Sequence, residues 1–179
     1  MKRIPSKTIF AALMALALAP IISARAEDNT LSAEAAKSVT AFNTADTGLN
    51  KFFENSAGYA ILPTVGQGAL VVGGEHGHGL VYAKGKLVGK ATLNEVTVGA
   101  QVGGGSFSEV IFFETADALK SFMGSNWSMD AKASATVAAS GSAANAKYMQ
   151  GVAVFTLPKS GAMLQAAVGG QKFKFEPLK

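Results

Sequence analysis

Residues 80–102 read LVYAKGKLVGKATLNEVTVGAQV and contain the pattern that decides the fold. Lys84-Gly85 suits a tight hairpin turn between the apolar runs on either side of it. From Glu95 to Val102, valine or alanine occupies every second position, and this period of two is strand spacing. The stretch therefore predicts neighbouring antiparallel strands joined by short turns.

Other strand-like segments lie on both sides of this stretch. They are residues 59–62, 69–72, 80–83, 87–93, 110–113, 128–139, 152–157, 162–168 and 172–175, with a turn-rich stretch around Gly73, Gly74, Gly77 and Gly79. Many of the 20 glycines interrupt strand-like sequence, where glycine usually marks a bulge, a sharp bend or a close backbone approach. The predicted fold is α+β, with a strongly curved or partly closed, barrel-like, largely antiparallel, glycine-rich sheet.

Two helices are predicted beside the sheet. From Leu31 to Phe53 the larger apolar residues recur at steps of three, four and seven, which is helical spacing, and Gly58 suits the C-terminal stop. We expect this amphipathic N-terminal helix to pack on the domain's own core, with a membrane surface as the alternative. Thr115 can cap a second, short helix that ends at Gly124.

The first 26 residues have the pattern of an export signal. Three basic residues among the first seven precede an apolar run, and Ala24-Arg25-Ala26 then supplies small residues where a signal peptidase reads them. The apolar run is about 14 residues long, whereas a membrane-spanning helix needs ~20. We predict a signal peptide over residues 1–26, cleaved after Ala26, and one exported, periplasmic domain over residues 27–179.

Charge and cysteine content argue against several classes of protein. The chain has 16 Lys and Arg against 12 Asp and Glu, but four of the basic residues lie in the predicted signal peptide, which leaves 12 against 12. Bulk nucleic-acid binding needs a broad basic surface, so no nucleic-acid partner is expected. The absence of cysteine excludes a disulfide framework and a lipid anchor on cysteine.

Short glycine-containing motifs follow one another along nearly the whole predicted mature chain. They are Gly58-Tyr59-Ala60-Ile61-Leu62-Pro63, Gly68, Gly73-Gly74-Glu75, Gly77, Gly79-Leu80-Val81, Val98-Gly99-Ala100-Gln101-Val102-Gly103-Gly104, Val110-Ile111-Phe112-Phe113, Ala118-Leu119, Phe122, Trp127, Asp130-Ala131, Ala133, Gly161-Ala162-Met163, Gly169 and Lys172-Phe173. In this order and spacing they resemble the SYLF domain family, over roughly residues 31 to 175. The resemblance implies a bacterial, exported member of that lipid-binding family, with affinity for anionic, phosphate-bearing headgroups and without the actin binding of some eukaryotic members.

The residues themselves offer a candidate surface for such a headgroup. Lys172 and Lys174 alternate with phenylalanines, so both lysines should share one face while the phenylalanines pack inward. If the hairpin of residues 162–175 that carries them neighbours the first hairpin, five ammonium groups can meet a phosphate, each worth ~1 kcal/mol near a membrane surface. The predicted lipid-binding residues are Lys84, Lys86, Lys90, Lys172 and Lys174. The alternative is that these lysines are solvated and protect strand edges from aggregation.

No catalytic arrangement is recognisable in the sequence. His76 and His78 should share a face of a strand, but Glu75 would point the other way and the chain has no third histidine, so no metal site is predicted. The glycine-rich stretches carry no nucleotide-binding pattern, and Ser106 and Ser108 lack the glycine-flanked elbow of a hydrolase. We expect a protein that is not an enzyme and needs no cofactor.

Two functions of different classes follow. The first is binding of an anionic phospholipid or membrane surface, which predicts salt-sensitive vesicle association that is lost when Lys172 and Lys174 become glutamate. The second is a structural or interaction protein of the envelope, which binds a protein partner through open sheet edges. The second function predicts indifference to vesicles and a stoichiometric complex with the partner.

Overall fold

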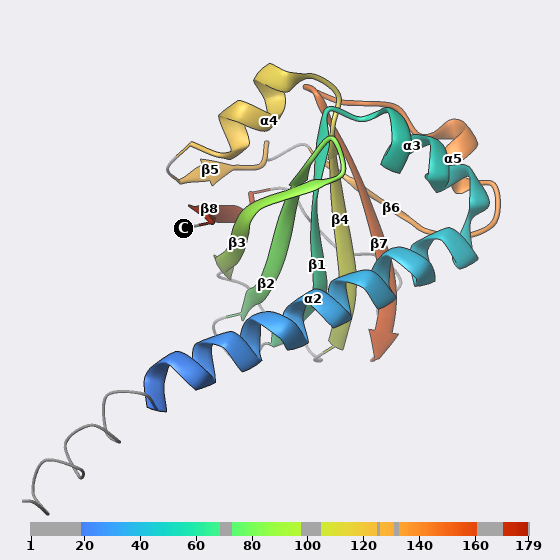
Figure 1. The fold of residues 1–179 in the computed structure, drawn as a ribbon. Coiled ribbons are helices and arrows are strands. Elements are labelled where there is room, and N and C mark those ends of the chain that lie inside the picture. Colours follow the sequence, from blue (N-terminus) through green and yellow to red (C-terminus); the bar gives the residue numbers. More distant parts are fainter. Residues whose placement is uncertain are drawn as a thin grey trace, which may run out of the picture.

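The computed structural model describes residues 19–68, 73–97, 105–124, 126–130, 133–160 and 170–178. The strands are β1 Gly58–Gly68, β2 Gly73–Ala83, β3 Lys86–Thr97, β4 Gly105–Phe113, β5 Trp127–Ser128, β6 Ala135–Val137, β7 Val152–Ser160 and β8 Lys172–Pro177. The helices are α2 Ala19–Ala45, the 3-10 helix η1 Thr47–Leu49, α3 Asn50–Asn55, α4 Ala116–Phe122 and α5 Ser142–Asn145. The predicted α+β class and the curved, largely antiparallel sheet are confirmed (Figure 1).

The eight strands form one sheet that curls into a half-barrel, in the order β5-β8-β3-β2-β1-β4-β7-β6. All neighbouring pairs are antiparallel except β6 and β7, which are parallel. The last strand along the chain, β8, lies beside β3 and not beside β7, which precedes it. The sheet therefore brings the C-terminal lysines next to the β2–β3 hairpin.

The turn between β2 and β3 has the geometry that the sequence predicts. Lys84 has a φ of 48° and Gly85 a φ of 75°. Two successive residues with positive φ are typical of a type I′ turn, whose twist matches that of the strands it joins. The turn residues therefore project from the end of the sheet.

The turn predicted around Gly73, Gly74, Gly77 and Gly79 is wrong, because these residues lie within β2. Here glycine allows two strands to pack closely and does not form a turn of the chain. Gly77 and Gly79 lie against β1 where its register shifts between Ile61 and Thr64. Predicted strand residues 69–72, 98–102 and 162–168 lie outside the described residues.

The single helix predicted over Leu31–Phe53 is divided in two at Asp46. Asp46 has an extended backbone, with φ −150° and ψ 108°, and its carboxylate caps the next turn by accepting from the Gly48 N–H at 2.9 Å. The same carboxylate accepts from the Ala143 N–H at 2.6 Å and the Ser142 hydroxyl at 2.9 Å. The bend turns α3 back over the sheet and ties it to α5.

Hydrogen bonds to this buried carboxylate, the Ala143 N–H foremost, lower the pKa of Asp46. At pH 7 the free energy of unfolding of the Asp46→Ala variant is expected to be about 1–2 kcal/mol lower than that of the wild type. A lowered folded-state pKa means that the stabilisation is present above the ordinary value of 3.8 and is lost as the pH falls through the lowered pKa. Urea unfolding should therefore show the difference between wild type and variant shrinking below about pH 4. Asp117→Ala, at an exposed position of α4, is the control.

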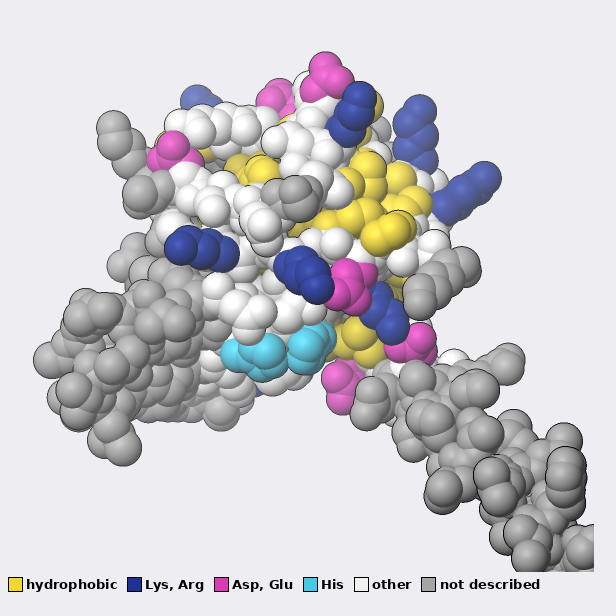
Figure 2. Space-filling model, turned by 90° about the vertical axis from the view of Figure 1, so that its left-hand side faces the viewer, with side chains coloured by type: hydrophobic (Ala, Val, Ile, Leu, Met, Phe, Trp, Pro, Cys, Tyr) yellow, Lys and Arg dark blue, Asp and Glu magenta, His cyan; other side chains and the backbone are white. Residues whose placement is uncertain are grey.

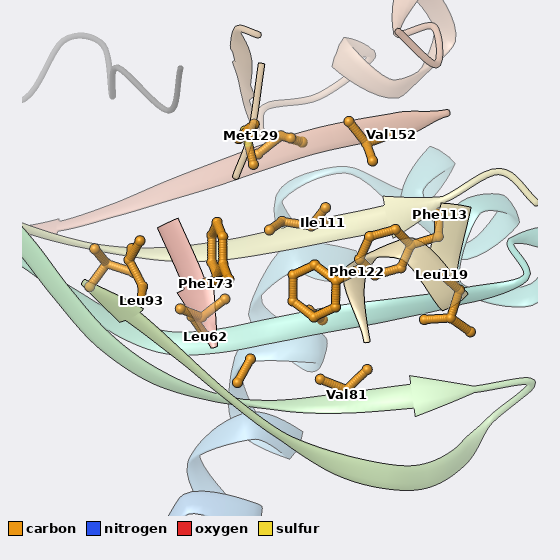
Figure 3. Packing of buried hydrophobic residues seen from close by; sticks show 14 of the residues in the cluster. Leu62, Val81, Leu93, Ile111, Phe113, Leu119, Phe122, Met129, Val152 and Phe173 are labelled. Carbon is orange, nitrogen blue, oxygen red and sulfur yellow. The ribbon is translucent and has the colours of Figure 1, made fainter. Parts of the chain in front are cut away.

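Apolar side chains cover both faces of the sheet. The inner, concave face packs against α4 through an inner core whose labelled members in Figure 3 include Leu62, Val81, Ile111, Phe113, Phe122 and Phe173. The opposite face packs against α2, η1, α3 and α5 through an outer core that includes Phe42, Leu49, Phe112 and Phe155. The expectation that the N-terminal helix packs on the domain's own core is thus confirmed. None of the described helices is long and apolar enough to cross a membrane.

Candidate functional site

Three of the five predicted lysines share one face beside the β3–β8 pair. Lys90 lies opposite Glu176, and Lys174 lies opposite Thr92. Lys172 lies opposite Ser128 of β5. Lys172 and Lys174 are exposed while Phe173 between them is buried, so the predicted alternation along β8 is confirmed.

Carboxylates accompany two of these three lysines. The Lys90 ammonium pairs with Asp28, which lies on α2. Lys174 donates a hydrogen bond to the Glu176 carboxylate at 2.8 Å, and this bond raises the pKa of Lys174 and lowers that of Glu176. Both members of the second pair are well exposed, so the pair stabilises the fold little. It does, however, cancel charge on the β8 face.

Lys84 and Lys86 lie elsewhere, at the tip of the β2–β3 hairpin. Lys86 is six strand positions from Thr92, which is opposite Lys174, and this corresponds to about 20 Å of extended strand. The structure therefore brings the two lysine groups onto neighbouring strands but not into one cluster of five. Both tip lysines are exposed, and neither forms an ion pair within the described part of the chain.

An apolar row runs across the sheet to this tip. Its members are successive cross-strand partners on the outer face: Leu87, Tyr82, Tyr59, Phe112 and Ala153. Phe112 is fully buried, whereas Tyr59, Tyr82 and Leu87 are only half-buried. Figure 2 shows a hydrophobic patch among lysine side chains at the upper right of the view.

Ring contacts hold the tyrosines in place. The Tyr59 and Tyr82 rings stack with centroids 4.9 Å apart, and Phe53 of α3 meets Tyr59 edge-on at 5.0 Å. Burial, with a smaller contribution from Tyr82, raises the pKa of Tyr59 to about 12, and burial also raises the pKa of Tyr82. Both phenols therefore stay neutral at physiological pH. We call Lys84, Lys86, Leu87, Tyr82 and Tyr59 the hairpin end.

A groove of about 840 Å³ lies between α2 and the strands β1, β2 and β3. Its lining includes Lys90 and His78, but also the carboxylates of Asp28, Glu34 and Glu176. Because these three acidic groups outnumber the one lysine, the groove is a poor receptor for a phosphate-bearing headgroup. The hairpin end, whose lysines have no acidic partner within the described residues, suits an anionic surface better.

A buried polar contact inside the half-barrel was not foreseen from the sequence. Gln171 donates from Nε2 to Oε2 of Glu109 at 3.0 Å, and both residues have no exposed surface. Glu109 lies opposite Thr156 on β7. A carboxylate is rarely buried without partners, and Gln171 supplies one. The contact also links the start of β8 to β4 across the interior. The signal was a lone glutamate directly before the apolar run 110–113.

Comparison with protein families and with curated proteins adds no relative. No protein-family model matches the chain, and no curated protein shows significant similarity to it. The resemblance to SYLF domains therefore rests on the residues quoted for it and stays a prediction.

Proposed function

We propose that this chain is a non-catalytic lipid-binding protein that docks on anionic phospholipid surfaces with its hairpin end. The observation that carries the proposal is the placement of two exposed lysines, with no acidic partner in the described residues, directly beside half-buried tyrosine and leucine side chains. Lysines near an anionic membrane contribute about 1 kcal/mol each. Tyrosines suit the boundary between headgroups and acyl chains because their rings are apolar and their hydroxyls polar.

Two further points support the lipid class. The motifs that resemble SYLF domains include Tyr59 at the hairpin end. The exported, periplasmic location that residues 1–26 predict would also place the protein beside phospholipid membranes. The proposed surface differs from the predicted five-lysine cluster, because Lys90 and Lys174 have carboxylate partners of their own.

Charge reversal at the hairpin end should weaken vesicle binding most. We expect Lys84→Glu with Lys86→Glu to make the free energy of binding to anionic vesicles less favourable by about 2 kcal/mol or more. This lowers the partition coefficient roughly 30-fold. The measurement is co-sedimentation with vesicles of phosphatidylglycerol and phosphatidylcholine, at low and moderate salt. The full chain is used for every variant, so any membrane affinity of residues 1–26 is the same throughout.

Lys172→Glu with Lys174→Glu is the matched control, because it changes the net charge by the same amount on a different part of the surface. We expect a smaller loss for this control. Equal losses in both double variants would mean that overall charge, and not the hairpin end, governs binding. Absence of binding to either vesicle type in the wild type would refute the lipid function.

The alternative, an envelope protein that binds a partner through open sheet edges, has less support. The two outermost strands of the described sheet are β5, with two residues, and β6, with three. Short edge strands offer few unpaired backbone groups to an incoming strand. Indifference to vesicles together with a stoichiometric protein complex would favour this alternative.

A further inference from the structure

The only two histidines of the chain lie side by side on β2. His76 and His78 are both exposed and share the face that the period of two predicts (Figure 2, cyan). Their rings are nearly perpendicular, at 87°, with centroids 4.7 Å apart. Their Nε2 atoms are 3.1 Å apart. Two imidazole nitrogens therefore lie within hydrogen-bond distance of each other on the exposed face of the strand.

The neighbouring strand β3 orients both rings through their other nitrogens. His76 Nδ1 lies 2.8 Å from Asn94 Oδ1, and an amide oxygen only accepts, so Nδ1 of His76 carries the proton. His78 Nδ1 lies 3.3 Å from the Thr92 hydroxyl, which can donate to it. In this arrangement His78 Nε2–H donates to the lone pair of His76 Nε2 across the 3.1 Å contact, and a metal ion bound by both rings would replace that shared proton.

We propose that His76 and His78 form a binding site for a divalent transition-metal ion, copper(II) above all. Metal–imidazole bonds are about 2.0–2.1 Å long, so nitrogens 3.1 Å apart subtend roughly 95–100° at the metal. This angle lies between the 90° of tetragonal and the 109° of tetrahedral coordination. Imidazole suits copper, nickel and zinc, and copper(II) binds most tightly of the divalent series.

Water completes the coordination in this site. Within the described residues no group of three or more histidine, aspartate or glutamate side chains is placed to hold a metal ion together. Asn94 and Thr92 act as outer ligands, because they orient the rings through Nδ1 and keep the two Nε2 atoms beside each other. Two neighbouring lysines are compensated, since Lys90 pairs with Asp28 and Lys174 with Glu176. A third, Lys159, donates to the Thr64 hydroxyl opposite His78 and adds a positive charge on this face.

Titration of the full chain with Cu²⁺ tests the site. We expect one copper ion per chain and an electron paramagnetic resonance spectrum with hyperfine splitting from two nitrogens. His78→Gln should reduce affinity at least tenfold and leave one imidazole nitrogen in the spectrum. Asn94→Ala retains both ligands but loses the outer contact, and should weaken binding about 10- to 100-fold.

Lys120→Gln, at an exposed position of α4 on the opposite, inner face of the sheet, is the control and should bind copper as the wild type does. Circular dichroism of each variant without metal checks that the fold is intact. Equal copper affinity in the wild type and in the variant with both histidines replaced would overturn the proposal, as would a spectrum with fewer than two nitrogens in the wild type. The site is independent of the proposed lipid function, so vesicle binding and copper binding fail separately.

Discussion

Replacement of Phe112 by alanine is expected to lower the free energy of unfolding by about 3–5 kcal/mol. Phe112 has no exposed surface. Its ring is surrounded by those of Phe52, Phe53, Tyr59 and Phe155, with centroids 5.3, 4.8, 6.1 and 5.9 Å away. Alanine would remove the ring from the middle of this cluster and leave a cavity that four fixed neighbours cannot fill. Because small domains are stable by only about 5–15 kcal/mol, the loss is a large fraction of the total.

Urea unfolding, followed by circular dichroism, measures this loss as a shift of the midpoint at constant slope. Leu178→Ala is the control, because Leu178 is 48% exposed and its truncation should change stability by no more than about 0.5 kcal/mol. A loss below about 1 kcal/mol for the Phe112 variant would contradict the packing of α3 and β7 around this ring.

Gly79→Ala is expected to destabilise the protein by about 1–3 kcal/mol although it adds a single methyl group. A Cβ atom at Gly79 would lie 2.4 Å from the carbonyl oxygen of Ile61 and 2.8 Å from Cγ of Leu62. The first neighbour is backbone, so β1 would have to move away from β2. Gly79 lies beside the shift of register in β1 between Ile61 and Thr64.

Gly66→Ala is a matched control in the adjacent strand. A Cβ atom there has the carbonyl oxygen of His76 as its nearest neighbour, 3.9 Å away, which is ordinary contact. We expect the control to lie within about 0.5 kcal/mol of the wild type in thermal or urea unfolding. Similar losses in both variants would mean that the close approach at Gly79 is not what matters.

The local elements of the fold follow from the sequence, because hydrophobic period and turn chemistry act over a few residues. The hairpin at Lys84-Gly85, the cap at Thr115 and the curvature inferred from glycine are all confirmed. The pairing of β8 with β3 and the parallel pair β6–β7 were not predicted, since they depend on packing between distant segments. Gly77 and Gly79 were misread because turn glycines and close-packed strand glycines look alike in a single sequence.

The candidate site was predictable in part for the same reason. The exposed face of Lys172 and Lys174 follows from alternation alone. The partner of Lys90 does not, because Asp28 lies on α2, 62 residues earlier in the sequence. The half-buried state of Tyr82 depends on its stacking against Tyr59 of β1, which Phe53 of α3 meets edge-on, and the alternation of β2 does not contain these contacts.

The outer core also sets the order in which the chain can fold. Phe42 and Leu49 lie near the start of the described chain, but Phe155, which belongs to the same cluster, lies near its other end. Contacts between segments so far apart form slowly, and sheets dominated by them fold in milliseconds to seconds. A nascent chain that has not yet reached β7 therefore lacks one wall of the outer core, even when β1 and β2 already contact α2. The packing around Phe42 and Leu49 is completed only once β7 has joined the sheet.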